Sequence, residues 1–553
     1  MLPILLLAAL SFLSALGRGA ISDTDEAFYA EASREMVESG DWLTPHFNYE
    51  PRFQKPALYY WLTSATYLVA GPTELAARLW AALSGIGLVL VTAGCGRRWC
   101  DDETGLLAGA IAASAFGYFA LARMALPDLP LAFFITATIW AAFLATLERE
   151  RQPRRWILLA AAAAALGFLV KGPLAVLIPA LVVLPVVLIE RRSFNLRLGD
   201  IGLALVLFVA IAAPWYVLMW MRHGPPYLEG FFVGDNFDRF ATSRFNDPRP
   251  WWFYLPVAAG GLLPWTPLIL VWVAPLAQFL RRRRDISTID LRLLLWTLLP
   301  LIFFTISIGK QPRYILPVLP PLAILLASSI LERTRDWRSL DGTRVRPRPN
   351  RSVMLGSIGA GVVLVGIGAL LYRAQPLFVG VSGFTTSAVA ATIAMCGVAV
   401  IVVSVTAWRM VPAVLAVAAA LTFAVLPYGA LAASDAATIR AIARLVQDAR
   451  TGHEEIATYK VFVRNLVFYT GLRQIDLIHD DHVTEWASRT PGALLVLRAG
   501  DASRLERERG LTFDRLATLP YFDEGGLRVG TLLWPDPAHD LEEVTVVRVR
   551  RKP

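Results

Sequence analysis

The sequence predicts a polytopic α-helical membrane protein with a small α/β domain at its C-terminal end. Hydrophobic residues make up 56% of the 553 residues and charged residues only 18%, and the mean hydropathy is +0.52, which is far more apolar than soluble domains of this length. The apolar residues also run continuously, over lengths near the roughly 20 residues that a helix needs to cross a bilayer. Membrane β-strands would alternate apolar and polar residues instead.

Thirteen apolar segments are candidate membrane spans. They cover residues 1–17, 75–96, 104–122, 129–147, 156–171, 174–189, 200–221, 254–280, 291–309, 314–331, 353–372, 385–408 and 411–433. We interpret 1–17 as a first span whose true start lies upstream. The alternative, a cleaved signal peptide, would need a basic segment before the apolar run.

The basic residues predict the orientation of these spans. They crowd alternate loops, at Arg97 and Arg98, 149–155, 191–197, Arg281–Arg284 and 333–351. Basic loops face the cytoplasm, so the formal charge of +9 is a topology signal and not a nucleic-acid footprint. The loops 18–56 and 222–250 and the C-terminal tail are then external. Residues 57–96 join an external loop to an internal one and therefore cross the membrane once. The longer apolar run, 75–96, is the expected span, so 57–71 lies at the external surface as an interfacial helix or re-enters the membrane.

The tail from 434 to 553 changes character and predicts a separate periplasmic α/β domain behind the transmembrane domain of 1–433. Strand-like runs lie at 493–497, 529–534 and 544–549, and helical patterns at 439–450 and 502–509.

Charged residues gather at the external ends of the spans. The first loop carries Asp23, Asp25 and Glu26, a short turn carries Asp128, and 309–314 carries Lys310 and Arg313. Each of these residues also has a purely structural explanation. Ser22 and Asp23 could form capping boxes, Asp128 could begin a helix, and the cations could snorkel to the membrane surface. A charge in a membrane span costs up to about 3 kcal/mol, so their coincidence at one face favours a site for an anionic lipid.

Several motifs resemble those of a known family. They are D-T-D-E-A-F-Y-A-E (23–31), G-D-W-L-T-P-H-F-N (40–48), R-F-Q-K-P-A-L-Y-Y-W (52–61), A-L-P-D (125–128) and K-Q-P-R-Y-I-L-P-V-L-P-P (310–321). Together they resemble the polytopic lipid-linked glycosyltransferases of the protein O-mannosyltransferase type, which have the GT-C fold. Within that family the likeness is to the transferases of 4-amino-4-deoxy-L-arabinose to lipid A.

The resemblance implies an inverting pentosyltransferase at the periplasmic face of the bacterial inner membrane. Its donor would be a sugar on undecaprenyl phosphate and its acceptor a lipid A phosphate, a modification that lowers surface negative charge and is associated with polymyxin resistance. The implied catalytic residues are Asp25, Asp128 and Glu26. The implied substrate-binding residues are Lys55, Tyr59, Tyr60, Lys310, Arg313 and Tyr314. We expect a monomer in the bilayer.

The role of Asp25 depends on the acceptor. A hydroxyl acceptor would need a general base, whereas a phosphate is already a nucleophilic anion. With a phosphate acceptor, Asp25 would orient a substrate, pair with an amino-sugar cation or stabilise positive charge at the anomeric carbon. No cofactor is implied. Relatives carry Glu-Lys-Pro where this chain has Gln54-Lys55-Pro56, which weakens a divalent metal site, although His46 and His223 remain possible ligands.

Two alternative functions compete with this assignment. A relative that glycosylates proteins or another envelope glycan is the nearest alternative. A lipid or sugar transporter would place ionisable residues in the middle of its spans and repeat broken helices in two halves, and the sequence shows neither pattern.

Overall fold

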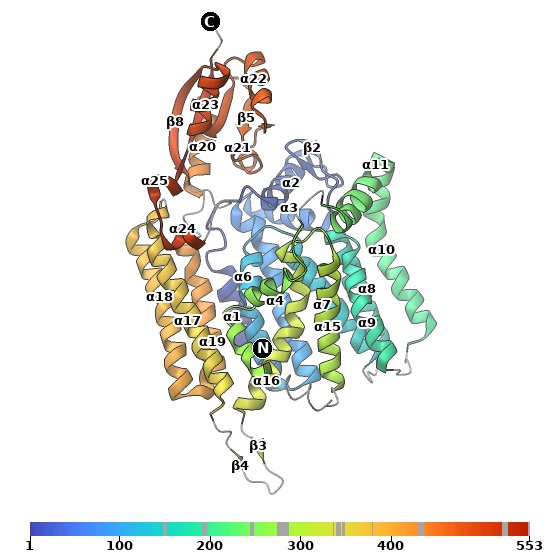
Figure 1. The fold of residues 1–553 in the computed structure, drawn as a ribbon. Coiled ribbons are helices and arrows are strands. Elements are labelled where there is room, and N and C mark those ends of the chain that lie inside the picture. Colours follow the sequence, from blue (N-terminus) through green and yellow to red (C-terminus); the bar gives the residue numbers. More distant parts are fainter. Residues whose placement is uncertain are drawn as a thin grey trace.

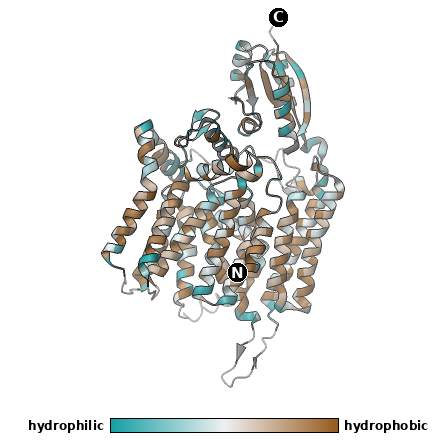
Figure 2. Ribbon diagram, turned by 180° about the vertical axis from the view of Figure 1, so that it is seen from behind, coloured by the Kyte–Doolittle hydropathy of each residue, from teal (hydrophilic) through white to brown (hydrophobic). Residues whose placement is uncertain are grey.

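The computed structural model describes residues 1–147, 152–190, 196–243, 248–273, 287–335, 337–338, 344–345, 349–378, 380–429, 436–521 and 529–550. A bundle of apolar helices carries a smaller mixed domain at one end (Figures 1 and 2). Parts of the basic loops, including Arg149, Arg151, Arg191, Arg192 and Arg281–Arg284, lie outside the described residues.

Nine helices of the described chain are long and apolar enough to cross a membrane, and eleven if each of two bent helix pairs forms one span. The nine are α4 (Glu74–Trp99), α7 (Asp128–Thr146), α8 (Pro153–Lys171), α10 (Leu198–His223), α15 (Thr288–Ile306), Pro312–Thr334 (η3 and α16), Arg351–Leu377 (α17 and η4), α18 (Gly383–Thr406) and Trp408–Tyr428 (η5, α19 and η6). Two expected spans are the shorter helices α1 (Leu2–Leu13) and α9 (Leu174–Glu190). The chain is thus a multi-pass membrane protein, and a count of thirteen stays a prediction.

The two bent pairs meet at their breaks. Helices α5 (Asp102–Ala113) and α6 (Phe116–Ala122) form an angle of 53°, and α13 (Tyr254–Gly261) and the 3₁₀ segment η2 (Thr266–Trp272) an angle of 106°. The Phe116 N–H donates to the Leu263 carbonyl at 2.9 Å, and Trp265 Nε1 donates to Ser114 Oγ at 3.0 Å. Each break thereby supplies partners for the other, as irregular backbone inside a membrane requires.

The first loop folds over one end of the bundle. It contains α2 (Asp25–Ser39), the short hairpin β1 (His46–Phe47) and β2 (Glu50–Pro51), and α3 (Leu58–Ala70). Helix α3 is absent from the nine candidate spans and lies beside α2 at the end of the bundle that carries the C-terminal domain (Figure 1). The second long loop forms α11 (Pro225–Leu228), the π-helical segment η1 (Glu229–Phe237) and α12 (Asp238–Ala241).

The opposite end of the bundle holds described residues of the basic loops. Arg335, at the end of α16 (Leu319–Thr334), donates to Asp101 at 2.8 Å beside Arg97 and Arg98. The strands β3 (Trp337–Arg338) and β4 (Arg344–Val345) extend from this end, away from the C-terminal domain (Figure 1). This distribution agrees with the expected alternation of basic and polar loops.

The C-terminal domain is a five-stranded mixed sheet covered on both faces. Its strand order is β6-β5-β7-β9-β8, and β5 pairs in parallel with β6 and β7. The strands are β5 (Ile456–Tyr459), β6 (Ile475–Leu477), β7 (Leu494–Arg498), β8 (Phe513–Tyr521) and β9 (Glu542–Val549). One face packs on α20 (Ala436–Ala449) and the other on α22 (Asp480–Arg489) and α23 (Ala499–Arg509). The continuous apolar run of β7 reflects this double cover.

One expected strand is wrong. Residues 529–534 contain α24 (Val529–Leu533), which is followed by α25 (Pro537–Asp540). Helix α24 packs against the end of α17 (Arg351–Ala374), where Leu532 joins an apolar cluster with Leu377 and Arg373 Nε donates to the Leu533 carbonyl at 3.1 Å. A short apolar run fits a helix as well as a strand, and here the end of α17 partly covers the helix through Leu532.

Candidate active site

The three acidic residues that open the first loop lie in three different environments. Thr24, and not Ser22 or Asp23 as expected, is the N-cap of α2 and accepts from the Glu26 N–H. Asp23 points to the C-terminal domain, where it accepts from the Val463 N–H at 3.1 Å. Asp25 and Glu26 occupy the first turn of α2, where a carboxylate suits the helix dipole, and they point in different directions.

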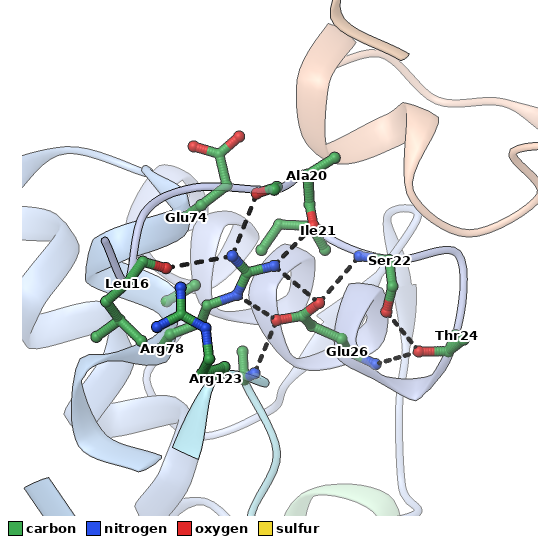
Figure 3. Close-up of polar contacts among 12 residues, drawn as sticks. Leu16, Ala20, Ile21, Ser22, Thr24, Glu26, Glu74, Arg78 and Arg123 are labelled. Carbon is green, nitrogen blue, oxygen red and sulfur yellow. Dashed lines mark hydrogen bonds and ion pairs between the residues drawn. The ribbon is translucent and has the colours of Figure 1, made fainter. Parts of the chain in front are cut away.

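Glu26 is buried and joins α2 to neighbouring parts of the bundle. Its carboxylate pairs with Arg78 Nε of α4 at 2.8 Å and accepts from the backbone N–H groups of Ser22 and Ala125, each at 2.9 Å (Figure 3). Arg78 also donates to backbone carbonyls of the segment before α2, such as that of Ala20 at 2.6 Å. Both Glu26 oxygens therefore have partners, and Glu26 does not line the cavity that Asp25 reaches.

Asp25 lines a polar cavity of about 320 Å³ between the first loop, the bundle and the C-terminal domain. Its charged lining residues are Asp25, Arg52, Lys55, Asp128, Lys171, Asp235, Arg239, Arg313 and Arg464. Six cations against three carboxylates leave an excess of three positive charges. Such a cavity favours an anion, and guanidinium and ammonium groups match phosphate well.

Arg313 joins the two acidic residues that the sequence singled out. Its guanidinium pairs with Asp25, and its Nε lies 3.5 Å from Asp128 Oδ1. Burial alone would raise the pKa of Asp25, but the charge and hydrogen bond of Arg313 outweigh it, so this pKa lies below its ordinary value of 3.8. Asp128, at the start of α7, also accepts from Lys171 Nζ at 2.5 Å.

The second long loop supplies further charged groups. Asp235 of η1 pairs with Lys55 and, at 2.8 Å, with Arg239 of α12. Tyr314 lies under the Lys171 ammonium, which is 5.2 Å from the ring centroid. The side chain of Asp235 is only 2% exposed, so this ion pair is buried.

An apolar cavity of about 350 Å³ adjoins the polar one. The two share Lys55, Lys171, Asp235, Arg239 and Tyr314 in their walls. The remaining wall of the apolar cavity comes mainly from Pro173, Leu174, Leu177, Phe232, Phe237, Phe240, Phe303 and Phe304. A charged cavity joined to an apolar one matches a lipid that carries a phosphate head and a hydrocarbon chain.

The expected site residues divide into two groups. Asp25, Lys55, Asp128, Arg313 and Tyr314 all line the polar cavity. Tyr59, Tyr60, Lys310 and Glu26 do not. Tyr59 donates to the Ala77 carbonyl at 3.3 Å, Tyr60 stacks behind the cavity-lining Tyr29, and Lys310 Nζ donates to the Ser307 carbonyl at 2.5 Å. Their assignment to the substrates stays a prediction.

The sequence reasoning missed several cavity residues. Asp235 and Arg239 have the i,i+4 spacing of a helical ion pair, which is the signal that could have found them. Lys171 ends helix α8, where a single cation is typical of snorkelling to the membrane surface. The possible metal ligands lie elsewhere: His223 Nε2 is 2.8 Å from Thr44 Oγ1, and neither His46 nor His223 lines the cavity. Within the described chain, no three His, Cys, Asp or Glu residues gather as a metal site would require.

A solved structure has a similar fold. ArnT from Cupriavidus metallidurans bound to undecaprenyl phosphate matches with a TM-score of 0.74 and 23% identity, over 100% of this chain and 99% of that one. The architecture therefore defines a class, the multi-pass membrane proteins with the GT-C fold and a C-terminal mixed domain.

Sequence comparison finds proteins that are similar to part of the chain. Residues 15–223 match the model described as dolichyl-phosphate-mannose-protein mannosyltransferase, the type of protein that the sequence motifs resemble. Two curated relatives are undecaprenyl phosphate-alpha-4-amino-4-deoxy-L-arabinose arabinosyl transferases. That of Aeromonas salmonicida is 35% identical over 335 residues, and that of Pseudomonas aeruginosa 36% over 352 residues. The matches cover 60% and 63% of this chain but only 59% and 61% of the relatives' own length.

Proposed function

We propose that this protein transfers 4-amino-4-deoxy-L-arabinose from undecaprenyl phosphate to a phosphate of lipid A, at the periplasmic face of the bacterial inner membrane. The observation that carries this proposal is the polar cavity with its excess of cations, joined through Lys55 and Lys171 to an apolar cavity. The relatives' names supply the sugar and the carrier.

The reaction needs a leaving group, a nucleophile and little proton transfer. An oxygen of the acceptor phosphate forms a bond to the anomeric carbon, while the bond from that carbon to the carrier phosphate breaks. The carrier phosphate leaves with the electron pair and gains a negative charge. Lys55, Lys171 and Arg239 lie where the two cavities meet, so they are placed to stabilise that charge as it develops.

The ionisation of Asp25 favours a phosphate acceptor over a hydroxyl. A hydroxyl must lose a proton to a general base whose pKa lies near the operating pH. Asp25 is held ionised by Arg313 with a pKa below 3.8, which makes it a weak base. An ionised Asp25 suits a different task, pairing with the ammonium of an amino sugar and stabilising positive charge at the anomeric carbon.

The experiment is transfer by the purified protein in lipid nanodiscs. Undecaprenyl-phosphate-linked aminoarabinose and lipid A are supplied, and the lipid A product is measured by mass spectrometry. We expect the mass of lipid A to rise by one aminoarabinose residue. A protein or another glycan that takes the sugar while lipid A stays unmodified would favour the alternative acceptor.

A further inference from the structure

The C-terminal domain is attached to the first loop beside the polar cavity. Asp23 accepts from three consecutive backbone N–H groups, those of Val463 at 3.1 Å, Arg464 at 2.6 Å and Asn465 at 3.2 Å. Asn465 Nδ2 also donates to the Ile21 carbonyl at 3.0 Å. Figure 3 shows the C-terminal domain, in faint orange, above the segment that holds Ile21 and Ser22. The connection therefore fixes one short segment of the domain, residues 463–465. Asp23, which holds this segment, is two positions before Asp25 in the sequence.

The segment that leads to Arg464 has an unusual backbone. Lys460 has a φ of 58° and Phe462 a φ of 52°, both in the left-handed region that residues other than glycine rarely adopt. Strain of this kind persists where surrounding contacts enforce it, and it is common at functional sites. Here the Asp23 carboxylate enforces it by binding the N–H groups that immediately follow.

The conformation brings the Arg464 side chain into the wall of the polar cavity. Its guanidinium carbon lies 5.3 Å from the centroid of the Phe28 ring, and that of Arg52 lies 4.0 Å from the same centroid. In the described chain, neither arginine forms an ion pair with a carboxylate, whereas the other four cations of the cavity do. Two cations are thus left for an anion from outside the protein.

These two arginines lie in the part of the polar cavity that the apolar cavity does not share. Arg52, Arg464 and Phe28 line the polar cavity but not the apolar one. Lys55 and Lys171 line both cavities. A donor whose hydrocarbon chain occupies the apolar cavity places its phosphate beside these lysines, which leaves the two arginines for the second substrate.

We propose that Arg464 of the C-terminal domain, together with Arg52, holds the phosphate of the acceptor lipid. The acceptor site is then shared by the membrane bundle and the C-terminal domain, and Asp23 is a positioning residue that sets the place of Arg464. This inference rests on the proposed transferase function, and it assigns the C-terminal domain a part in acceptor binding.

The test compares Arg464→Gln with Arg473→Gln in the purified full-length protein, with donor and acceptor KM measured separately. Arg473 is a matched control because it joins the same domain to the first loop, through Glu50 at 2.7 Å, but is exposed and lies outside the polar cavity. Loss of a charge-assisted phosphate contact is expected to raise the KM for lipid A by about tenfold or more. The KM for undecaprenyl-phosphate aminoarabinose should stay within about twofold, and Arg464→Lys should recover part of the loss.

Two further measurements make the outcome decisive. Asp23→Asn should raise the acceptor KM in the same direction, while binding of undecaprenyl phosphate stays at the wild-type level. If Arg464→Gln leaves the acceptor KM at the value of Arg473→Gln, or raises the donor KM instead, the inference is wrong while the transferase function stands. If Arg464→Gln does not fold, an unchanged acceptor KM in Arg464→Lys and Asp23→Asn overturns it. A wild-type protein without transfer to lipid A refutes the proposed function itself.

Discussion

At the scale of single residues, the site depends on one arginine that joins two carboxylates. Arg313 comes from the segment before α16, whereas Asp25 and Asp128 begin α2 and α7. These three residues are more than a hundred positions apart in the sequence, yet the structure brings them to one cavity wall. Their meeting is the geometric basis for assigning the chemistry to this end of the bundle.

Replacing either carboxylate should abolish most of the activity. We expect Asp25→Asn and Asp128→Asn each to lower kcat/KM by about 100-fold or more, because each removes a charge that is preorganised beside the reacting groups. Transfer of aminoarabinose by the purified variants measures this. Asp41→Asn is the control. Asp41 belongs to the same loop as Asp25 and pairs with Arg222 at 2.9 Å, but it does not line the cavity. Variants that insert normally and transfer at the wild-type rate would refute the site.

The ionisation of Asp25 makes a separate prediction for pH dependence. Its pKa is lowered below 3.8, so the contribution of the ionised form is complete above that value and is lost as the pH falls through it. The profile of kcat/KM should therefore show no acid limb from Asp25 between about pH 5 and pH 8. An acid limb within that range that moves in an Asp25→Glu variant would show that Asp25 titrates as a general base.

The sequence motifs predicted five residues of the cavity wall, because these residues sit in short segments with a recognisable pattern. Asp235, Lys171 and Arg464 were not predicted as site residues. Each carries one charge in an otherwise ordinary context, and its role depends on a partner from a distant element, such as Asp128 for Lys171. A single cation at a helix end, such as Lys171, fits snorkelling equally well, so only the tertiary structure separates the two interpretations of that residue.

At the scale of elements, the interface between α2 and α4 depends on Glu26 and Arg78. Burial would raise the pKa of Glu26, but the Arg78 guanidinium outweighs it and lowers this pKa below its ordinary value of 4.5. The pair thus stabilises the fold above the unfolded-state pKa, and this stability is lost as the pH falls through the lower pKa of the folded protein. Such a pair fixes the direction in which α2 presents Asp25.

We expect Glu26→Gln to act mainly on stability. Removing one partner of a buried ion pair costs about 3–5 kcal/mol, which should appear as a lower Tm of the detergent-solubilised protein. Glu38→Gln is the control, because Glu38 pairs with Arg34 at 2.9 Å with half of its side chain exposed, and an exposed pair contributes about 0–1 kcal/mol. A Glu26→Gln protein with the Tm of the control but no transfer would instead make Glu26 a catalytic residue.

Hydropathy predicted where the helices run but not how they bend. Residues 104–122 form one apolar run, yet the chain breaks between α5 and α6. The break is stabilised by Leu263 and Trp265 from a segment about 150 residues away. Because that contact is tertiary, apolar composition alone contains no signal for it. The same reason explains α24, whose helical form depends on the end of α17.

At the scale of the whole molecule, the C-terminal domain lies at one end of the bundle (Figure 1), and its Arg464 lines the polar cavity. The basic loops predict that this end is periplasmic. Alkaline phosphatase fused after the C-terminal residue should therefore be active in bacterial cells, because that enzyme folds only in an oxidising compartment. Fusion of the same reporter at the β3–β4 hairpin should give an inactive enzyme. The reverse pattern would place the site in the cytoplasm and contradict the proposed localisation.

The most direct test of the central proposal is mass spectrometry of lipid A from cells with and without this gene. We predict that lipid A from cells carrying the gene contains species heavier by one aminoarabinose residue. Deletion should remove these species, and the wild-type gene but not the Asp25→Asn gene should restore them. A lipid A profile that is the same with and without the gene, under conditions where the protein and its donor lipid are both present, would contradict the proposed function.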